Sequence, residues 1–444
     1  MFHKQKLRVP AFIMLLAAIP VLQSCFKDKH IETLTYTANS PVYMSDDEFK
    51  TSVKMEGPRA MHEPGKIYLY DNTLYINEVN QGVHVVNNTN PSNPQKIGFI
   101  NIPGNIDIAI KGNALYADSY TDLITLDISD PNNVIEVSRE EDVFQYTLPS
   151  WNSSYPLAQI DPSRGVVVGW EVKEVSETCE DGECGWRPNF VASNSVQADE
   201  AGFSTFAGIG NNSRISVVGS GVGQAGSMAR FMLHKDYLYI IDTDFSMSLY
   251  NTVDPMQPSY STTASVGNNI ETLFVNEDKL FIGSETGMFI YDLSTPENPT
   301  YVSQFEHAQG CDPVVVYGNT AYVTIRGGTP CGGFDNQLDV IDITNINNPT
   351  LITSASMDSP FGLGVDGTRD VLFVCDGSSG LKVFDTKNRE AIPSKMIENL
   401  RGFHAFDAIT QNGLLLMTGA DGLYQFDYND PQNVSMVSVM TLGE

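Results

Sequence analysis

Short runs of alternating apolar and polar residues recur along the chain from about residue 66 to its end. Such alternation is typical of half-buried β-strands, and the runs are separated by turns rich in Asn, Asp, Gly and Pro. Long stretches with helical spacing are scarce. The pattern therefore predicts an all-β fold. The seven clearest units each open on a turn residue, at Asn72, Asn113, Asp236, Asp278, Asn319, Asp370 and Asn412.

The spacing of these turn residues is nearly constant. Four of the six steps are 41 or 42 residues, one step of 51 contains the Gly/Pro/Cys segment 327–335, and one step of 123 is three periods. A unit of about 41 residues with four short strands has the size of a β-propeller blade. The alternative is a linear β-solenoid, whose rungs are usually shorter, at roughly 20 to 30 residues.

The step of 123 residues leaves room for a unit with a weaker pattern. We expect its first two strands at 155–160 and 166–170 and its outermost strand at 213–218, with an insertion at about 177–212 between them. This interpretation gives eight blades, and seven blades with a large surface excursion is the alternative. We also expect the alternating residues 49–55 to pair with the last blade and help close the ring, because closure removes exposed strand edges.

The third strand of several units ends in a motif of one kind. It reads Leu-Asp-Val-Ile-Asp at 338–342, Leu-Ile-Thr-Leu-Asp at 123–127 and Leu-Lys-Val-Phe-Asp at 381–385. The units resemble the LVIVD repeat family from about residue 66 to the end, apart from the insertion, and the copy at 247–254 departs from the motif. The resemblance implies a β-propeller of the kind found in secreted or surface lipoproteins. It supplies no catalytic residues, because no reaction is assigned to the family.

The first 25 residues have the pattern of an export signal. Three basic residues precede the apolar run 9–22, which at about 14 residues is too short to span a membrane and suits the core of a signal peptide. Cys25 follows Leu-Gln-Ser, which resembles the bacterial lipobox apart from Gln23 in place of a small residue. We therefore expect a lipoprotein signal peptide at 1–24, a lipidated Cys25 with a flexible tether at 25–47, and the propeller at 48–444. An ordinary cleaved signal with an incidental cysteine is the alternative.

Lys27 and Asp28, shortly after this cysteine, resemble the surface-export signal of Bacteroidota lipoproteins. This resemblance implies a lipoprotein of the bacterial outer membrane that is exposed at the cell surface. No later apolar run in the sequence is long enough to span a bilayer, so the lipid is the only membrane anchor that we expect.

The charge of the chain narrows the choice of partners. Asp and Glu number 54 against 26 Lys and Arg, which gives a formal net charge of -28. Such a chain is not expected to bind nucleic acid, because tight binding to phosphates requires many basic side chains. The same charge disfavours electrostatic attraction to anionic lipids. The hydrophobic content of 41% excludes a disordered chain.

The cysteines suggest two disulfides in an oxidising environment outside the cytoplasm. Cys311 and Cys331 bracket the first two strands of one blade, and their pairing would hold its enlarged loop. Cys179 and Cys184 would close a small loop within the insertion. Cys375 is left over, and we expect it to be buried in a strand. A zinc site is disfavoured, because the chain has no Cys-x-x-Cys pair.

A few polar residues are candidates for a binding site. His404 and Asp407 lie on a strand that we expect to line the channel, and Asp312 and Arg230 are other positions where a ligand in the channel would be met. Trp186, between Gly and Arg in the insertion, is the best single candidate for an exposed contact, since aromatic rings suit contacts with proteins or sugars.

No cofactor is expected. Acidic residues crowd the insertion, and Ca²⁺ would need several of their oxygens to converge. The sequence has no EF-hand spacing, so a solvated acidic loop is the preferred interpretation.

The sequence therefore predicts a lipid-anchored envelope propeller that acts as a non-enzymatic scaffold and binds protein or glycan. The chain has no Gly-x-Ser-x-Gly, P-loop or His-Glu-x-x-His motif. The alternative is a propeller enzyme of the hydrolase, lactonase or lyase type with a site in the central channel. Fold alone does not decide between them, because propellers host both kinds of function.

Overall fold

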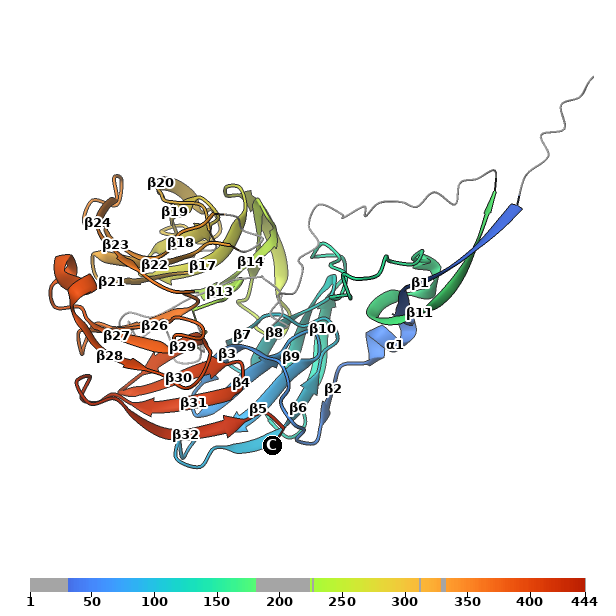
Figure 1. Cartoon of the computed structure of the whole chain (residues 1–444), viewed down its shortest axis with the longest axis horizontal. Helices are drawn as coiled ribbons and strands as arrows, with labels where there is room; N and C mark the ends of the chain where they lie inside the picture. The colour runs from blue at the N-terminus through green and yellow to red at the C-terminus, as the bar shows by residue number, and fades with distance from the viewer. Residues whose placement is uncertain (1–30, 181–223, 226, 311–312, 329–332, 444) are drawn as a thin grey trace, which may run out of the picture.

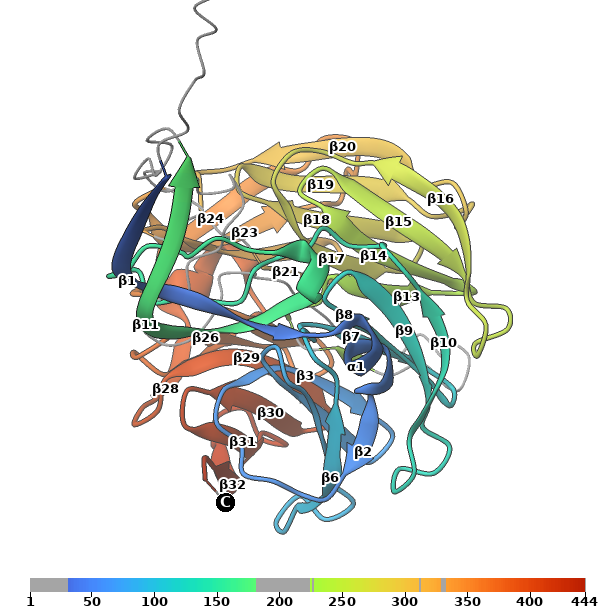
Figure 2. The same cartoon turned by 90° about the vertical axis from the view of Figure 1, so that its right-hand side faces the viewer.

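Seven antiparallel sheets stand around a central axis and form a closed ring (Figures 1 and 2). The computed structural model describes residues 31–180, 224–225, 227–310, 313–328 and 333–443. Each sheet is a blade built on four consecutive strands, with the first strand innermost and the fourth outermost. The prediction of an all-β propeller is confirmed. The ring has seven blades, so the preferred count of eight is wrong and the alternative of seven is correct.

The strands of the seven blades follow one another along the chain. Blade 1 contains β3 (Pro64–Tyr70), β4 (Thr73–Glu78), β5 (Gly82–Asn87) and β6 (Gln95–Asn101). Blade 2 contains β7 (Ile108–Lys111), β8 (Ala114–Ser119), β9 (Asp122–Asp127) and β10 (Ile135–Glu140). Blade 3 contains β13 (Phe231–His234), β14 (Tyr237–Thr243), β15 (Ser246–Asn251) and β16 (Ser259–Ser265). Blade 4 contains β17 (Ile270–Asn276), β18 (Lys279–Ser284), β19 (Gly287–Asp292) and β20 (Thr300–Glu306). Blade 5 contains β21 (Val314–Tyr317), β22 (Thr320–Arg326), β23 (Asn336–Asp342) and β24 (Thr350–Ser356). Blade 6 contains β25 (Leu363–Asp366), β26 (Val371–Cys375), β27 (Leu381–Asp385) and β28 (Met396–Leu400). Blade 7 contains β29 (Ala405–Gln411), β30 (Leu414–Gly419), β31 (Gly422–Asp427) and β32 (Ser435–Thr441).

One turn recurs at the end of the third strand in every blade. The last residue of that strand is Asp or Asn, and its side-chain oxygen accepts a hydrogen bond from the backbone N–H two residues later. Such an Asx turn reverses the chain locally. The final Asp of the repeat motif is therefore a structural residue, which accounts for part of the acidic excess. The seven acceptors are Asn87, Asp127, Asn251, Asp292, Asp342, Asp385 and Asp427.

Side chains close the ring between its first and last blades. Asn88 and Gln425 are both buried and exchange two hydrogen bonds, of 2.9 and 2.8 Å between nitrogen and oxygen. Ser438 Oγ donates to the carbonyl oxygen of Pro91 at 2.6 Å. All four strands of blade 7 come from the C-terminal end of the chain, so the closure relies on contacts between blades.

A second substructure, which we call the cap, consists of residues 31–56 and 141–180 and lies over one face of the ring (Figure 2). Strand β1 (Ile31–Met44) pairs with β11 (Val166–Glu180) in an antiparallel two-stranded ribbon. The prediction that residues 166–170 begin an eighth blade is wrong, because they pair with this N-terminal strand. Residues 31–44 are likewise a strand instead of the flexible tether that we expected. The predicted strand at 213–218 lies outside the described residues.

Helix α1 (Asp46–Thr51) attaches the cap to blade 2. Its one buried residue, Phe49, packs against the ring of Tyr120, with 6.0 Å between centroids, and lies under the guanidinium of Arg139. Strand β2 (Lys54–Glu56) then extends the outer edge of blade 1 by pairing with β6. The expected pairing of residues 49–55 with the last blade is therefore wrong. A short 3₁₀ turn, η1 (Pro162–Arg164), precedes β11, and a second, η2 (Arg389–Ser394), connects β27 to β28.

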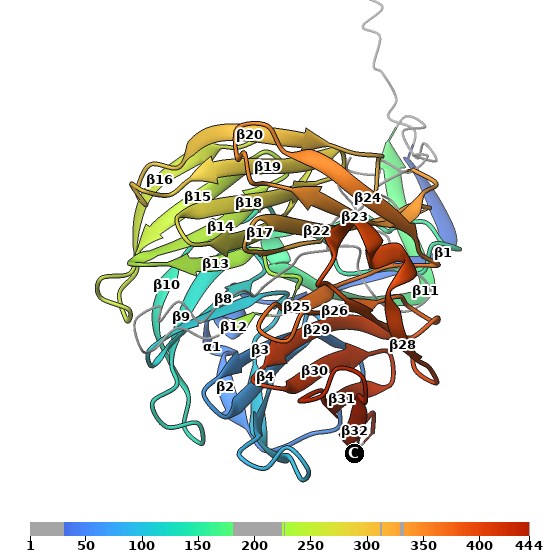
Figure 3. The same cartoon turned by 90° about the vertical axis from the view of Figure 1, so that its left-hand side faces the viewer.

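The channel at the centre of the ring contains part of the chain itself. We call residues 224, 225 and 227–230 the channel segment. Its strand β12 (Gln224–Ala225) pairs with the inner strand β3 in the antiparallel sense, and Gln224 lies opposite Leu69 (Figure 3). The segment therefore runs against the direction of the seven inner strands. It leads from the face that carries the Asx turns, which we call the turn face, to the face under the cap, which we call the cap face.

Candidate functional site

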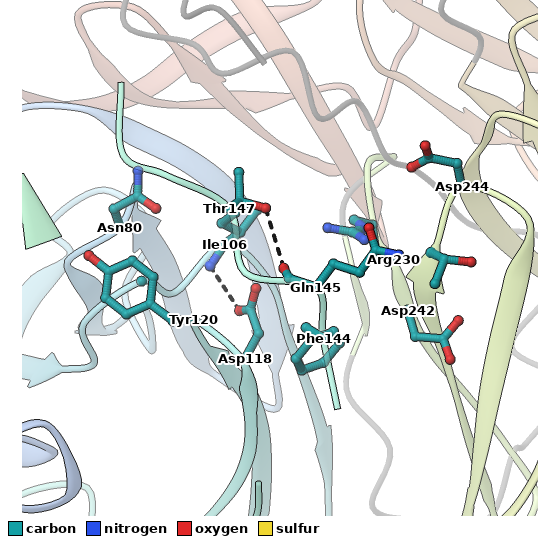
Figure 4. A pocket seen from close by; sticks show the side chains of 12 residues that line it. Asn80, Ile106, Asp118, Tyr120, Phe144, Gln145, Thr147, Arg230, Asp242 and Asp244 are labelled. Atoms are coloured by element: carbon teal, nitrogen blue, oxygen red, sulfur yellow. Dashed lines mark hydrogen bonds between the residues drawn. The ribbon is translucent and has the colours of Figure 1, made fainter. Parts of the chain in front are cut away.

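One recess lies on the cap face, between the ring and the cap. This pocket is partly open to solvent (Figure 4). Loops of blades 1 to 3 and the cap segment after β10 each supply part of the wall. The side chains labelled in the figure are Asn80, Ile106, Asp118, Tyr120, Phe144, Gln145, Thr147, Arg230, Asp242 and Asp244.

Asp118 forms part of the pocket floor at the end of β8. Its Oδ1 accepts hydrogen bonds from the backbone N–H groups of Ile106 at 2.8 Å and Asp107 at 2.9 Å and from Asn105 Nδ2 at 2.8 Å. Burial disfavours the charged carboxylate and raises the pKa of Asp118 to about 6, although these hydrogen bonds oppose the shift. The carboxyl group therefore holds the loop that leads into β7.

Sequence reasoning missed Asp118, and the repeat contains only an approximate signal for it. Glu78 occupies the corresponding end of β4 and accepts backbone hydrogen bonds from His62 and Glu63. Asp376, just after β26, does the same for the backbone of residues 358 and 359. An acid thus lies near the end of the second strand in three blades, but Glu78 and Asp376 align with Ser119, one position after Asp118.

Arg230 joins the pocket to the channel. Its guanidinium Nη2 donates to the Ile241 carbonyl oxygen at 3.0 Å, and its backbone N–H donates to the carboxylate of Asp107. That carboxylate also pairs with Lys66 at 3.0 Å, and burial lowers the pKa of the Lys66 ammonium. Arg230 lines the pocket at the mouth of the channel on the cap face, and its role in binding a ligand stays a prediction.

The far wall of the pocket comes from the loop between β14 and β15. Asp242 accepts hydrogen bonds from the hydroxyls of Ser246 and Ser248, both at 2.6 Å. Asp244 is exposed at the rim, and Phe245 beside it has 53% of its surface exposed. The pocket thus offers a wall of hydrogen-bonding groups with an exposed aromatic ring at its edge.

Asp407 lies in the channel and binds the channel segment. Its Oδ1 accepts hydrogen bonds from the backbone N–H groups of Ser227 at 2.7 Å and Ala408 at 2.9 Å. Ser227 Oγ in turn accepts from the backbone N–H of Leu363 at 2.5 Å. Burial raises the pKa of Asp407 to about 7. The contacts of Asp407 are thus with the protein's own chain.

The neighbours of His404 are aromatic rings. Its ring packs against those of Phe361 and Phe406, with centroids 5.7 and 4.7 Å away. The contacts described for Arg230, His404 and Asp407 are with different neighbours, and Asp312 lies outside the described residues. Within the described part of the chain, no three His, Cys, Asp or Glu side chains are placed to hold a metal ion. The enzyme alternative stays a prediction.

The remaining predicted residues fall largely outside the structure. Cys25, Cys184, Trp186, Cys311 and Cys331 lie beyond the described residues, as does most of the insertion at 177–212. Cys179 is in β11 opposite Glu32, with its side chain undescribed, so both disulfides stay predictions. Cys375 is buried in β26 as a free thiol, as expected, and burial raises its pKa.

A second exposed aromatic ring lies on the loops of the cap face. Phe334, between β22 and β23 of blade 5, has 97% of its surface exposed. It occupies the same kind of loop, between second and third strands, as Phe245 in blade 3. A side chain so fully exposed to water contributes nothing to the core and is accessible to a partner.

Comparison with known protein families supports the repeat assignment. The model of the LVIVD repeat matches residues 105–141 and 311–356, which cover blade 2 and blade 5. The chain carries LVIVD repeats. Each matched LVIVD repeat contains the Asx turn described above, at Asp127 and Asp342. No curated protein matches the sequence.

Solved structures resemble this LVIVD-repeat chain at low sequence identity. The computationally designed Ika8 protein aligns with a TM-score of 0.49 and 8% identity, over 87% of this chain and 90% of its own. BamB from Moraxella catarrhalis aligns with a TM-score of 0.46 and 11% identity, over 84% of both chains. Hsv2p from Kluyveromyces lactis has a TM-score of 0.45 and 12% identity, over 87% and 98%.

Proposed function

We propose that the protein is a lipid-anchored scaffold of the bacterial cell envelope that binds a protein partner through its cap face. The observation that carries this proposal is the arrangement of that face. The pocket lies beside the exposed ring of Phe245, and Phe334 presents a second exposed ring from another loop of the same kind. Aromatic anchors surrounded by hydrogen-bonding groups are the usual centre of a protein interface.

The lipid anchor rests on the sequence. Cys25 directly follows the apolar run and the Leu-Gln-Ser tripeptide, and Lys27 and Asp28 support export to the surface of the outer membrane. No helix among the described residues is long and apolar enough to cross a membrane. The direct check is detergent phase separation of the full chain and of its Cys25→Ser variant, with mass analysis of the N-terminal peptide. An unlipidated peptide would contradict this part of the proposal.

Alanine variants on opposite parts of the surface test the binding face. We expect Phe245→Ala together with Phe334→Ala to weaken binding of solubilised envelope proteins at least tenfold, because interface aromatic residues commonly contribute about 2 kcal/mol each or more. Met436→Ala is the matched control, since Met436 is 53% exposed on β32, the outer strand of blade 7. Equal binding by the double variant and the control would refute the assignment of the cap face.

The same assay separates a protein partner from a glycan. Binding that survives protease treatment of the envelope fraction and is lost after periodate oxidation would identify a glycan in place of a protein. In that case the planar polar side chains of the pocket would be the contact, and Asn80→Ala and Gln145→Ala would weaken binding more than Phe334→Ala.

A further inference from the structure

The ribbon of the cap fixes where the N-terminal end of the described chain leaves the molecule. β1 and β11 are paired from Ile31 opposite Glu180 to Met44 opposite Val166, with one irregularity between Val42 and Tyr43. The outer end of the ribbon extends away from the cap face, on the side opposite the turn face (Figures 1 and 2). Any anchor attached before Ile31 therefore approaches the ring from the cap side.

The ribbon is held firmly at its base. Asn39 is buried, and its Nδ2 donates to the carbonyl oxygens of Asn152 at 2.9 Å and Tyr155 at 2.8 Å. Tyr146 Oη binds the backbone of Val167, with both the N–H and the carbonyl oxygen 2.8 Å away. These contacts hold the ribbon against the rest of the cap.

Chain length leaves little freedom between Cys25 and the ribbon. Five residues lie between Cys25 and Ile31, and the six steps from Cys25 to Ile31 reach at most about 22 Å when fully extended. The 14 residues of β1 extend about 45 Å at the usual rise of a strand, and a seven-residue inner strand such as β29 adds about 23 Å of ring depth. A lipid on Cys25 thus cannot bring the turn face against a membrane unless the ribbon detaches from the ring.

We propose that the cap face is the side of the propeller that faces the membrane, with the ribbon as the spacer, and that the partner bound there is a protein held in the same membrane. The inference rests on the proposed lipid anchor at Cys25. It assigns the pocket and Phe245 to the gap between ring and bilayer, where a membrane-bound protein reaches them and a partner on another cell does not.

Energy transfer in proteoliposomes tests the orientation. An azide-bearing amino acid is placed at Asp244 on the cap face or at Asp430 on the turn face of the lipidated full chain, and both sites are exposed aspartates in turns. Each is coupled to a donor dye, with acceptor dye on the lipid headgroups. We expect at least twofold more donor quenching at position 244. Equal quenching, or more at position 430, would overturn the orientation while leaving the lipid anchor intact.

Two further variants distinguish failure of the lipid anchor from failure of the ribbon as a spacer. Cys25→Ser is expected to abolish liposome binding, and binding that persists would overturn the lipid anchor together with the orientation. Removing Leu34 and Thr35 with their partners Glu177 and Ser176 shortens the ribbon by about 7 Å and preserves its alternation. Quenching at position 244 should then increase, and unchanged quenching would refute the role of the ribbon as spacer.

Discussion

The Asp407→Asn substitution tests the account of the channel. Asp407 has only 1% of its surface exposed and uses Oδ1 to accept hydrogen bonds from Ser227 and Ala408. Within the described residues its Oδ2 has no hydrogen-bond partner. Asparagine keeps the accepting oxygen in a side chain of nearly the same shape and removes the ionisation. The variant therefore isolates the cost of a buried negative charge.

The size of the effect follows from the shifted pKa. Burial raises the pKa of Asp407 from 3.8 to about 7 in the folded protein, so the folded state binds this proton more tightly than the unfolded state. Stability from this group is therefore greatest below the unfolded pKa, decreases as the pH rises and levels off above the folded pKa. A shift of about three units corresponds to roughly 4 kcal/mol in total, of which about 2.5 kcal/mol is lost between pH 5 and pH 8.

Denaturant unfolding at pH 5, 6, 7 and 8 measures this loss. We expect the free energy of unfolding of Asp407→Asn, relative to wild type, to rise by about 2 to 3 kcal/mol across that range. Other groups that titrate, such as Asp118, are present in both proteins and largely cancel in the difference. Asp244→Asn, at an exposed carboxylate, is the control and should follow wild type. A difference for Asp407→Asn that is independent of pH would refute the buried, raised-pKa carboxyl group.

Two pairs of substitutions test the repeat and the ring closure by denaturant unfolding. Gly422 has a φ of +145°, and a Cβ there would lie 2.1 Å from the Met440 carbonyl oxygen, so Gly422→Ala should destabilise the protein by more than about 2 kcal/mol. Gly112 has a φ of +58° with open space around it, so Gly112→Ala should cost only about 1 kcal/mol. Equal losses of stability would contradict the argument that the backbone approaches Gly422 too closely for a side chain. Asn88→Ala and Gln425→Ala should each destabilise the ring, and their double-mutant cycle should show a coupling of about 1 to 3 kcal/mol, with additivity as the contradictory result.

The repeat was predictable because the turns of each blade are determined by residues that are close together in the sequence. The Asx turn after the third strand depends on one side chain and the next two residues, so residues 123–127 and 338–342 display it in the sequence alone. The blade count was less accessible. Residues 166–170 have the apolar pattern of a blade strand. Such a pattern indicates a strand, but it does not identify the strand with which it pairs. The partner is β1, more than a hundred residues away.

The candidate site was predictable only in part. Arg230 and Asp407 were identified from their positions near inner strands, but nothing in the sequence of residues 227–229 indicates that they occupy the channel and bind Asp407. The pocket at the mouth of the channel also depends on the cap, whose residues 144–147 approach the loops of blades 2 and 3 only in the fold. Asp118 was not directly accessible, because the acids near the ends of the second strands in blades 1 and 6, Glu78 and Asp376, align one position after it.

Photo-crosslinking in intact cells tests most directly the central claim that the cap face is the binding face. A photoreactive amino acid at Phe245 reports on the cap face, and the same amino acid at Met436 reports on the outer strand of blade 7. The account predicts one discrete crosslinked partner from position 245 only, with its yield reduced by Phe334→Ala. Crosslinking at position 436 to the same partner, with none at position 245, would contradict it.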